Sequence, residues 1–181
     1  MKNVVDSDLI KEKGNETPEA TRMKRILCRI GNKLGFMVDI EEPPESEMGS
    51  LSIRHDVLWY VEPPEWYNKL LSVISSREDL EETYRDLIEK KKNERLLYVA
   101  FEIEATDQTT KGMKGDISNL SKLPYGIVVV RRGQNRTKKG AEGIRNRFER
   151  ALIEFRKLHG PNSVIIASFA DLEKLEKHFS A

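Results

Sequence analysis

The chain has 181 residues, but it contains little cysteine and histidine and has no long hydrophobic run. The single cysteine, Cys28, excludes an internal disulfide framework and a cysteine-rich zinc site. Three histidines make a multi-histidine metal site unexpected. No stretch approaches the roughly 20 apolar residues of a membrane span, and residues 1–17 lack the apolar segment of a secretory signal. These absences predict a cytoplasmic protein with no membrane partner.

An excess of charge of one sign is also missing. Lys and Arg total 31 and Asp and Glu total 30, so the formal net charge is +1, although charged residues make up 34% of the chain. Affinity for nucleic acid would therefore have to come from a local cluster of cations. Residues 131–150 form such a cluster, because their basic residues outnumber the acids eight to two. The cluster is either a solvated charged helix or a phosphate-binding segment, whose candidate residues are Arg131, Arg132, Arg136, Lys138 and Lys139.

Strand patterns alternate with helix patterns along the chain. Strands are expected at residues 36–40, 52–62, 96–105, 126–130 and 164–167, and helices at residues 19–34, 116–123, 137–158 and 171–179, with one or two more within 65–92. Polar loops are expected at 41–49 and 106–115. This order indicates an α/β fold with a mixed central sheet flanked by helices.

The chain divides into a short leading segment and one domain. Residues 1–17 are polar and aperiodic, which indicates a flexible N-terminal arm or a short cap. Residues 18–181 form a single domain with a helical insertion at about 63–93. The insertion has apolar residues that we expect to be buried, namely Trp66, Leu70, Leu71, Ile74, Leu80, Tyr84, Leu87 and Ile88.

Carboxylates in two of the expected strands form the chemically unusual feature of the sequence. Asp56 belongs to the first of these strands, and Glu102 and Glu104 to the second. Side chains alternate along a strand, so Glu102 and Glu104 share one face and lie beside Asp56 if the strands pair. Because converging anions repel, a hard divalent cation such as Mg²⁺ or Mn²⁺ would be their natural partner. The other interpretation, solvated acids on a half-exposed strand, fits less well because residues 96–101 are nearly all apolar.

Three stretches resemble the PD-(D/E)XK nuclease superfamily, whose members have a restriction-endonuclease-like fold. They are Arg-His-Asp-Val-Leu-Trp at 54–59, Phe-Glu-Ile-Glu-Ala-Thr at 101–106 and Lys-Gly-Asp-Ile-Ser-Asn-Leu at 114–120, and the resemblance covers roughly residues 19–131. It implies a metal-dependent endonuclease that hydrolyses phosphodiester bonds, with DNA as the expected substrate. Asp56 and Glu102 would be the metal ligands by this resemblance.

One position departs from the superfamily's pattern. The usual lysine two residues after the second acid is Glu104, which would be a further metal ligand or would orient water. The resemblance places the missing lysine on the following loop or helix, where Lys114 and Lys111 are the candidates. Further residues that would complete or support the site are Glu19, Asp116, Ser118 and Asn119, although Glu19 is also a typical first-turn acid.

Two other functions stay open at the level of sequence. The lost lysine is what a catalytically inactive nucleic-acid- or protein-binding module with the same fold would show. A non-nuclease α/β protein with structural acids is the third reading. Dimers are common among proteins of this kind, so a homodimer is a further expectation, although the sequence carries no dimer signature.

Overall fold

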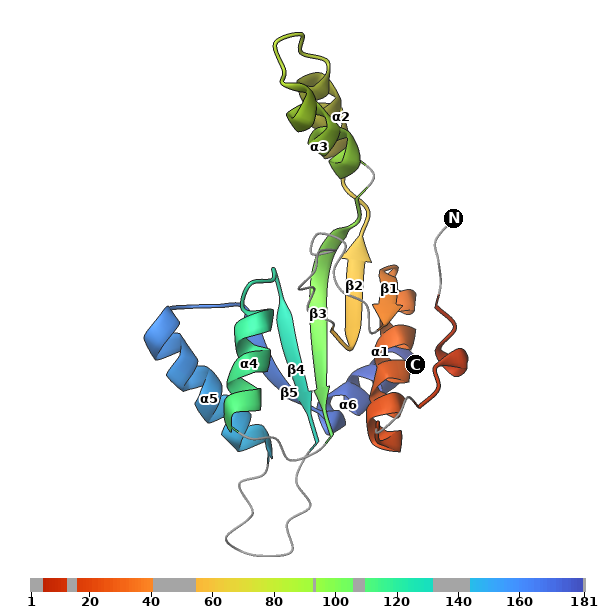
Figure 1. Cartoon of the computed structure of the whole chain (residues 1–181). Coiled ribbons are helices and arrows are strands. Elements are labelled where there is room, and N and C mark those ends of the chain that lie inside the picture. Colours follow the sequence, from red (N-terminus) through yellow and green to blue (C-terminus); the bar gives the residue numbers. More distant parts are fainter. Residues whose placement is uncertain are drawn as a thin grey trace, which may run out of the picture.

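The computed structural model describes residues 5–12, 16–40, 55–92, 94–105, 110–131 and 144–180, and a five-stranded mixed sheet lies at its centre (Figure 1). The strands are ordered β1-β2-β3-β4-β5, so spatial order follows chain order. The first three strands form an antiparallel meander, and β4 and β5 then run parallel to β3. The bounds are β1 Met37–Ile40, β2 Val57–Val61, β3 Leu96–Glu104, β4 Gly126–Val130 and β5 Val164–Ser168. The expected α/β class with a mixed sheet is confirmed.

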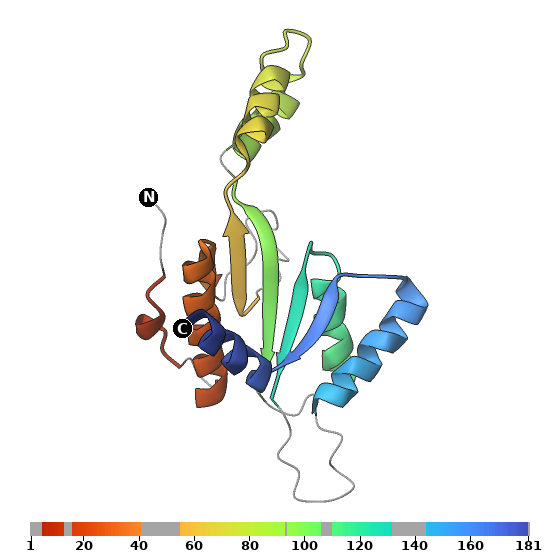
Figure 2. The same cartoon turned by 180° about the vertical axis from the view of Figure 1, so that it is seen from behind.

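Helices cover both faces of the sheet. One face carries α1 (Pro18–Leu34) and α6 (Phe169–Ser180), and the opposite face carries α4 (Thr110–Leu120) and α5 (Ile144–His159), as Figures 1 and 2 show. The two faces bury separate apolar clusters, with Val57, Phe101 and Ile103 beneath α1 and Leu58, Ala100 and Val128 beneath α4. None of the described helices is both long enough and apolar enough to cross a membrane.

The start of α1 shows how local sequence sets an element's boundary. The Thr17 hydroxyl accepts a hydrogen bond from the Ala20 N–H at 3.2 Å, and Pro18 occupies the first helical position. Gly35 ends the helix in the left-handed conformation, with φ 84°. The helix is thereby fixed at both ends, and its apolar stripe faces β2 and β3.

The segment before α1 lies against the body of the protein. Val5 and Ile10 pack on the core beneath α1, and the Arg25 guanidinium donates to the Ile10 carbonyl at 2.6 and 3.1 Å. Asn32 likewise donates to the Val5 carbonyl at 2.8 Å. Two apolar side chains and three hydrogen bonds therefore attach the described residues 5–12 to α1 and its core.

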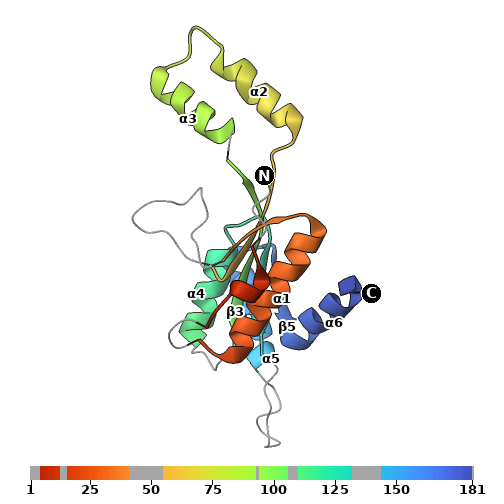
Figure 3. The same ribbon diagram turned by 90° about the vertical axis from the view of Figure 1, so that its right-hand side faces the viewer.

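A two-helix hairpin projects from the sheet between β2 and β3. Its helices, α2 (Glu65–Ser75) and α3 (Glu82–Lys92), contact each other and extend beyond the end of the sheet (Figures 1 and 3). Only two of the eight residues that we expected to bury there, Leu71 and Ile88, are buried. Trp66, Leu70, Tyr84 and Leu87 are exposed, because no third element from the described residues lies beside the hairpin to cover its outer surfaces.

Helix α4 begins earlier than the sequence predicts. A loop was expected over 106–115 because of Gly112 and Gly115, yet the helix starts at Thr110 and ends at Leu120. Met113, Ile117 and Leu120 are spaced along one helical face and are fully buried against the sheet. Their burial outweighs the low helix propensity of two glycines.

Strand β2 is shorter than the expected 52–62 and begins at Val57, while residues 51–54 lie outside the described part. His55 and Asp56 consequently precede the strand rather than belong to it. The expected helix over 137–158 is described from Ile144 to His159, and residues 132–143 lie outside the described part. The expected loop at 41–49 and residues 106–109 of the loop before α4 also lie there.

Gly126, the first residue of β4, offers a test of the contact between sheet and α4. A Cβ at this position would stand 2.6 Å from the Leu120 Cβ and 3.0 Å from the Leu120 carbonyl oxygen, so Gly126→Ala should lower the free energy of unfolding by about 1–3 kcal/mol. Gly115→Ala is the matched control, since its Cβ meets nothing within 4 Å and the change should be neutral or stabilising by about 0.5–1 kcal/mol. Urea unfolding of both variants measures this, and equal stability for the two would contradict the packing.

Candidate functional site

Asp56 directly precedes β2, at the end of the β2–β3 ladder that is nearest the end of β3. Its backbone N–H donates to the Phe101 carbonyl at 3.1 Å, one residue beyond the Val57–Phe101 pair. Its carboxylate Oδ2 then accepts the Ile103 N–H at 2.7 Å, where a further β2 carbonyl would otherwise be the acceptor. This hydrogen bond fixes the carboxylate at the point where the pairing of β2 with β3 stops, next to Glu102.

A buried lysine lies beside Asp56. Lys24, on the sheet-facing side of α1, is only 4% exposed, and its Nζ lies 3.1 Å from Asp56 Oδ1. The same Nζ lies 2.8 Å from Glu16 Oε1, whose side chain is also largely buried. The ammonium group therefore bridges two carboxylates from the start of α1 and the start of β2, as a buried charge requires.

His55 contacts the second expected ligand, Glu102. The imidazole is 2% exposed, and its Nδ1 lies 2.6 Å from Glu102 Oε1. The residues alternate along β3, so Glu102 and Glu104 face α4, on the same side of the sheet as Ala100. The imidazole thus fixes the orientation of the Glu102 carboxyl group.

Glu104 and Asp116 extend the group of acids onto α4. Glu104 is 9% exposed at the end of β3 and is hydrogen-bonded to Asp116, which requires a proton on one of the two carboxyl groups. Asp56 and Glu102 are close enough to Glu104 to disfavour its ionised form as well. Asp56, Glu102, Glu104 and Asp116 are called the carboxylate cluster below.

The cluster shifts the titration of two of its members. Burial raises the pKa of Glu102 to about 7, with the charges of Asp56 and Asp116 acting in the same direction and the hydrogen bond with His55 opposing them. Burial raises the pKa of Glu104 to about 8, assisted by Asp116, Asp56 and Glu102. The metal-free cluster therefore retains protons near neutral pH instead of carrying its full negative charge.

The donor atoms of the cluster fit a hard divalent cation in kind, because all are carboxylate oxygens. Among the described residues, however, no three His, Cys, Asp or Glu side chains already surround one point where a metal could bind. Asp56 directly precedes β2 and Glu102 lies on the neighbouring strand β3, and two carboxylates with waters and phosphate oxygens form a set that Mg²⁺ accepts. A cation that bound there would have to displace the protons of Glu102 and Glu104.

Several expected site residues lie elsewhere. Lys114 is exposed and pairs with Glu154 of α5 at 3.3 Å, so the structure does not bring it to the cluster. Glu19 pairs with Arg131 at 3.2 Å, as a first-turn acid with an external partner. Ser118 borders a small hollow between α4 and α5, and Asn119 is half-buried on α4. The side chain of Lys111 lies outside the described part, as do residues Arg132, Arg136, Lys138 and Lys139.

Sequence reasoning missed Lys24 and Glu16 and gave His55 no role at the site. A signal for Lys24 was present, because it occupies a position on the apolar stripe of α1, four residues after Ala20 and three before Leu27. A lysine on such a stripe needs a buried acid as partner. The identity of that acid depends on the register between α1 and β2, which the sequence does not contain.

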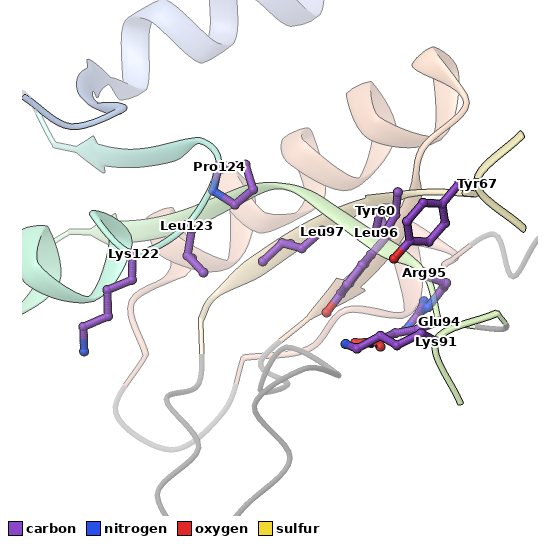
Figure 4. Close-up of a pocket in the computed structure, with 10 residues that line it drawn as sticks. All are labelled: Tyr60, Tyr67, Lys91, Glu94, Arg95, Leu96, Leu97, Lys122, Leu123 and Pro124. Atoms are coloured by element: carbon purple, nitrogen blue, oxygen red, sulfur yellow. Dashed lines mark ion pairs between the residues drawn. The ribbon is translucent and has the colours of Figure 1, made fainter. Parts of the chain in front are cut away.

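A second hollow of about 360 Å³ lies at the other end of β3 (Figure 4). Apolar and aromatic side chains line it together with three cations. One of these cations, Arg95, is held in place by Asp39 at 2.5 and 3.1 Å and by the Tyr60 ring, 4.4 Å from the ring centre. This second hollow contains no residue of the carboxylate cluster and is therefore separate from it. The residues that line the hollow are Tyr60, Tyr67, Lys91, Glu94, Arg95, Leu96, Leu97, Lys122, Leu123 and Pro124.

Comparisons of the chain with family models, with curated proteins and with solved structures found no match. The assignment of a function therefore depends on the geometry of the site.

Removing the buried ammonium group should be costly. Lys24→Met leaves Asp56 and Glu16 without their shared cation, and we expect a loss of about 3 kcal/mol in the free energy of unfolding at neutral pH. Combining it with Asp56→Asn, which keeps an acceptor for the Ile103 N–H, should recover part of that loss. Chemical unfolding of the two single variants and the double variant measures the coupling, and strictly additive effects would contradict the ion pair.

The raised pKa of Glu104 predicts a specific dependence of stability on pH. Between the ordinary pKa of 4.5 and the folded value of about 8, the folded chain binds more protons than the unfolded chain. The contribution of Glu104 is therefore fully present below about pH 4.5 and is lost as the pH rises through 8. Glu104→Gln should flatten this dependence and stabilise the metal-free protein above pH 8 by about 2 kcal/mol or more.

The control for this experiment is Glu82→Gln, at an exposed position on α3. Unfolding in metal-free buffers from about pH 5 to pH 9 compares both variants with the parent. If the Glu104 and Glu82 variants give the same profile, Glu104 does not titrate as described.

Proposed function

We propose that this chain is a metal-dependent nuclease with a restriction-endonuclease-like fold that hydrolyses phosphodiester bonds, with DNA as the substrate. The observation that carries the proposal is the carboxylate cluster at the end of β3, with a buried lysine at its side. Repelling, partly protonated acids in a protein interior cost free energy, which a bound cation offsets. Hydrolysis of phosphodiesters is the chemistry for which carboxylate-bound Mg²⁺ or Mn²⁺ is suited.

The topology supports the same proposal. A helix precedes an antiparallel meander of three strands, a helix crosses over, and a strand parallel to the third follows. Asp56 directly precedes the second strand of this unit, and Glu102 and Glu104 lie on the third, which agrees with the order that the resemblance to the PD-(D/E)XK superfamily implies. The fifth strand, β5, extends the sheet on the side away from the meander.

Each residue of the site would have a distinct task. Asp56 and Glu102 would hold the divalent cation, which would acidify a water and stabilise charge on the phosphate. His55 keeps the Glu102 carboxyl oriented, and Glu104, once a bound cation has displaced its proton, would be a further ligand or would orient the attacking water. Lys24 would supply the positive charge that Glu104 has replaced in the motif, from α1 instead of β3.

One observation favours a second candidate function. The ammonium group of Lys24 is already shared by Asp56 and Glu16, so it is neutralised in the protein as described. A chain that binds nucleic acid through the same fold without cutting it would tolerate such an arrangement. The experiment below separates the two by measuring cleavage and binding on the same samples.

Titration with Mg²⁺ or Mn²⁺ tests the proposal. A cation that binds only the folded chain should raise the melting temperature, by the equivalent of about 2.7 kcal/mol at a hundred times its dissociation constant. Glu102→Gln keeps an acceptor for His55 but removes the charge, so it should abolish this rise and the cleavage of labelled double-stranded DNA. Glu82→Gln, exposed on α3, is the matched control and should behave as the parent.

The outcomes are distinct. DNA cleavage that requires metal and is lost in Glu102→Gln and Asp56→Asn supports the nuclease. Binding of DNA by the parent without any cleavage, with or without metal, supports the inactive binding module. If metal does not raise the melting temperature and DNA is neither bound nor cleaved, both functions are contradicted. The cluster would then be a structural feature.

A further inference from the structure

The buried ammonium group of Lys24 is not shared equally by its two carboxylates. Its Nζ lies 2.8 Å from Glu16 Oε1 and 3.1 Å from Asp56 Oδ1. The Glu16 side chain is 10% exposed, whereas the Asp56 side chain is 25% exposed. Attraction between opposite charges strengthens as they approach each other and as water is excluded from around them. Glu16 therefore neutralises the larger part of the charge of Lys24.

The start of α1 brings Glu16 and Lys24 together. Glu16 directly precedes Thr17, whose hydroxyl caps the helix by accepting the Ala20 N–H. Lys24 follows Thr17 by about two helical turns, so the two residues lie on the same face of the helix. Side chains of a helix point back toward its N-terminus, so Lys24 extends toward Glu16. The helix cap and the buried ion pair together hold the ammonium group in place.

The two oxygens of the Asp56 carboxylate have contacts of different kinds. Oδ2 accepts the Ile103 N–H at 2.7 Å, and the position of this main-chain group is fixed because Ile103 is paired within the sheet. Oδ1 contacts the ammonium group of Lys24, whose position depends on Glu16. Glu16 can therefore influence the orientation of the Asp56 carboxylate through Lys24.

One ammonium group between two carboxylates leaves an excess of negative charge. Because Glu16 neutralises the larger part of the Lys24 charge, this excess lies mainly on Asp56, the more exposed of the two acids. The negative charge of Asp56 also acts on the carboxylate cluster, where it disfavours ionisation of Glu102 and Glu104. Without the charge of Glu16, the ammonium group would pair with Asp56 alone, and the pair would be neutral.

We propose that Glu16 is a positioning residue, which holds the Lys24 ammonium group so that Asp56 stays oriented but is not fully neutralised and can bind a second cation. Glu16 acts through Lys24 and belongs to the segment before α1, outside the carboxylate cluster. The identification of the second cation as Mg²⁺ or Mn²⁺ rests on the proposed function. The effect of Glu16 on Asp56 does not rest on it, so the two can be tested separately.

The NMR resonance of the Ile103 amide proton reports on Asp56 in the metal-free full chain, because this amide donates to Oδ2 and a charged acceptor strengthens the hydrogen bond. In Glu16→Gln, Lys24 should pair with Asp56 alone and draw its negative charge toward Oδ1, so the Ile103 resonance should move upfield. Glu19→Gln is the matched control, because it removes the same charge from the exposed first turn of α1 and should leave the resonance in place. An unchanged resonance in Glu16→Gln, or an equal shift in Glu19→Gln, would overturn the proposal.

Glu16→Asp provides a second variant, which keeps the charge and allows the measurement if Glu16→Gln does not fold. Its carboxylate is one methylene group farther from Lys24, so the Ile103 resonance should shift in the same direction but less than in Glu16→Gln. A shift in the opposite direction would refute the role of Glu16. Well-dispersed NMR spectra verify that each variant is folded.

Calorimetric titration with Mn²⁺ tests the consequence for cation binding without measuring cleavage. Glu16→Gln should raise the dissociation constant about tenfold, and Glu19→Gln by less than about twofold, although both remove one negative charge at the start of α1. Equal weakening in the two variants would show that only the net charge matters and would overturn the action through Lys24. If the parent binds no Mn²⁺, the proposed function and the second cation are contradicted, and the Ile103 resonance decides whether Glu16 positions Asp56.

Discussion

The hydrogen bond from the Ile103 N–H to the Asp56 carboxylate is the interaction on which the site depends. It replaces a main-chain acceptor with a charged one at the point where β2 stops pairing, so the strand's end and the acid's position are set together. Once Asp56 is fixed there, Lys24 contacts it from α1. Glu102 and Glu104, on the face of β3 that is turned toward α4, are close enough to be repelled by its charge. A shift of the β2–β3 register by one residue would separate all of these groups.

The charge of Lys24 does not balance the charges of all the acids around it. One ammonium group serves Asp56 and Glu16, while Glu102 depends on His55, and Glu104 on a proton shared with Asp116. Arrangements of this kind are uncommon in structural cores, because an apolar or fully paired alternative is more stable. The free energy that such buried acids cost is expected at functional sites, where the ionised carboxylate has a role. Strongly shifted pKa values are typical of functional sites.

Much of the sheet could be predicted because its strands are read from continuous apolar runs, as in Gly126–Val130 and Leu96–Glu104. The start of helix α4 was harder to predict, because its glycines disfavour a helix. Packing of Met113 and Ile117 against the sheet nevertheless stabilises it. The acids could be named from the sequence, but Lys24 as a partner could not, because α1 and β2 meet only through tertiary packing. The prediction that the apolar residues of the hairpin are buried was wrong for most of them for the same reason. Periodicity identifies an apolar stripe without showing what covers it.

The place where the hairpin joins the sheet has a consequence for how such a protein can diverge. Val61 and Leu96 are cross-strand partners at the base of the hairpin. The last residue of β2 and the first residue of β3, which the hairpin connects, are therefore about 5 Å apart. A tight turn spans the same gap. A different insert at this junction would therefore leave the carboxylate cluster unmoved, because the cluster lies at the opposite end of β3.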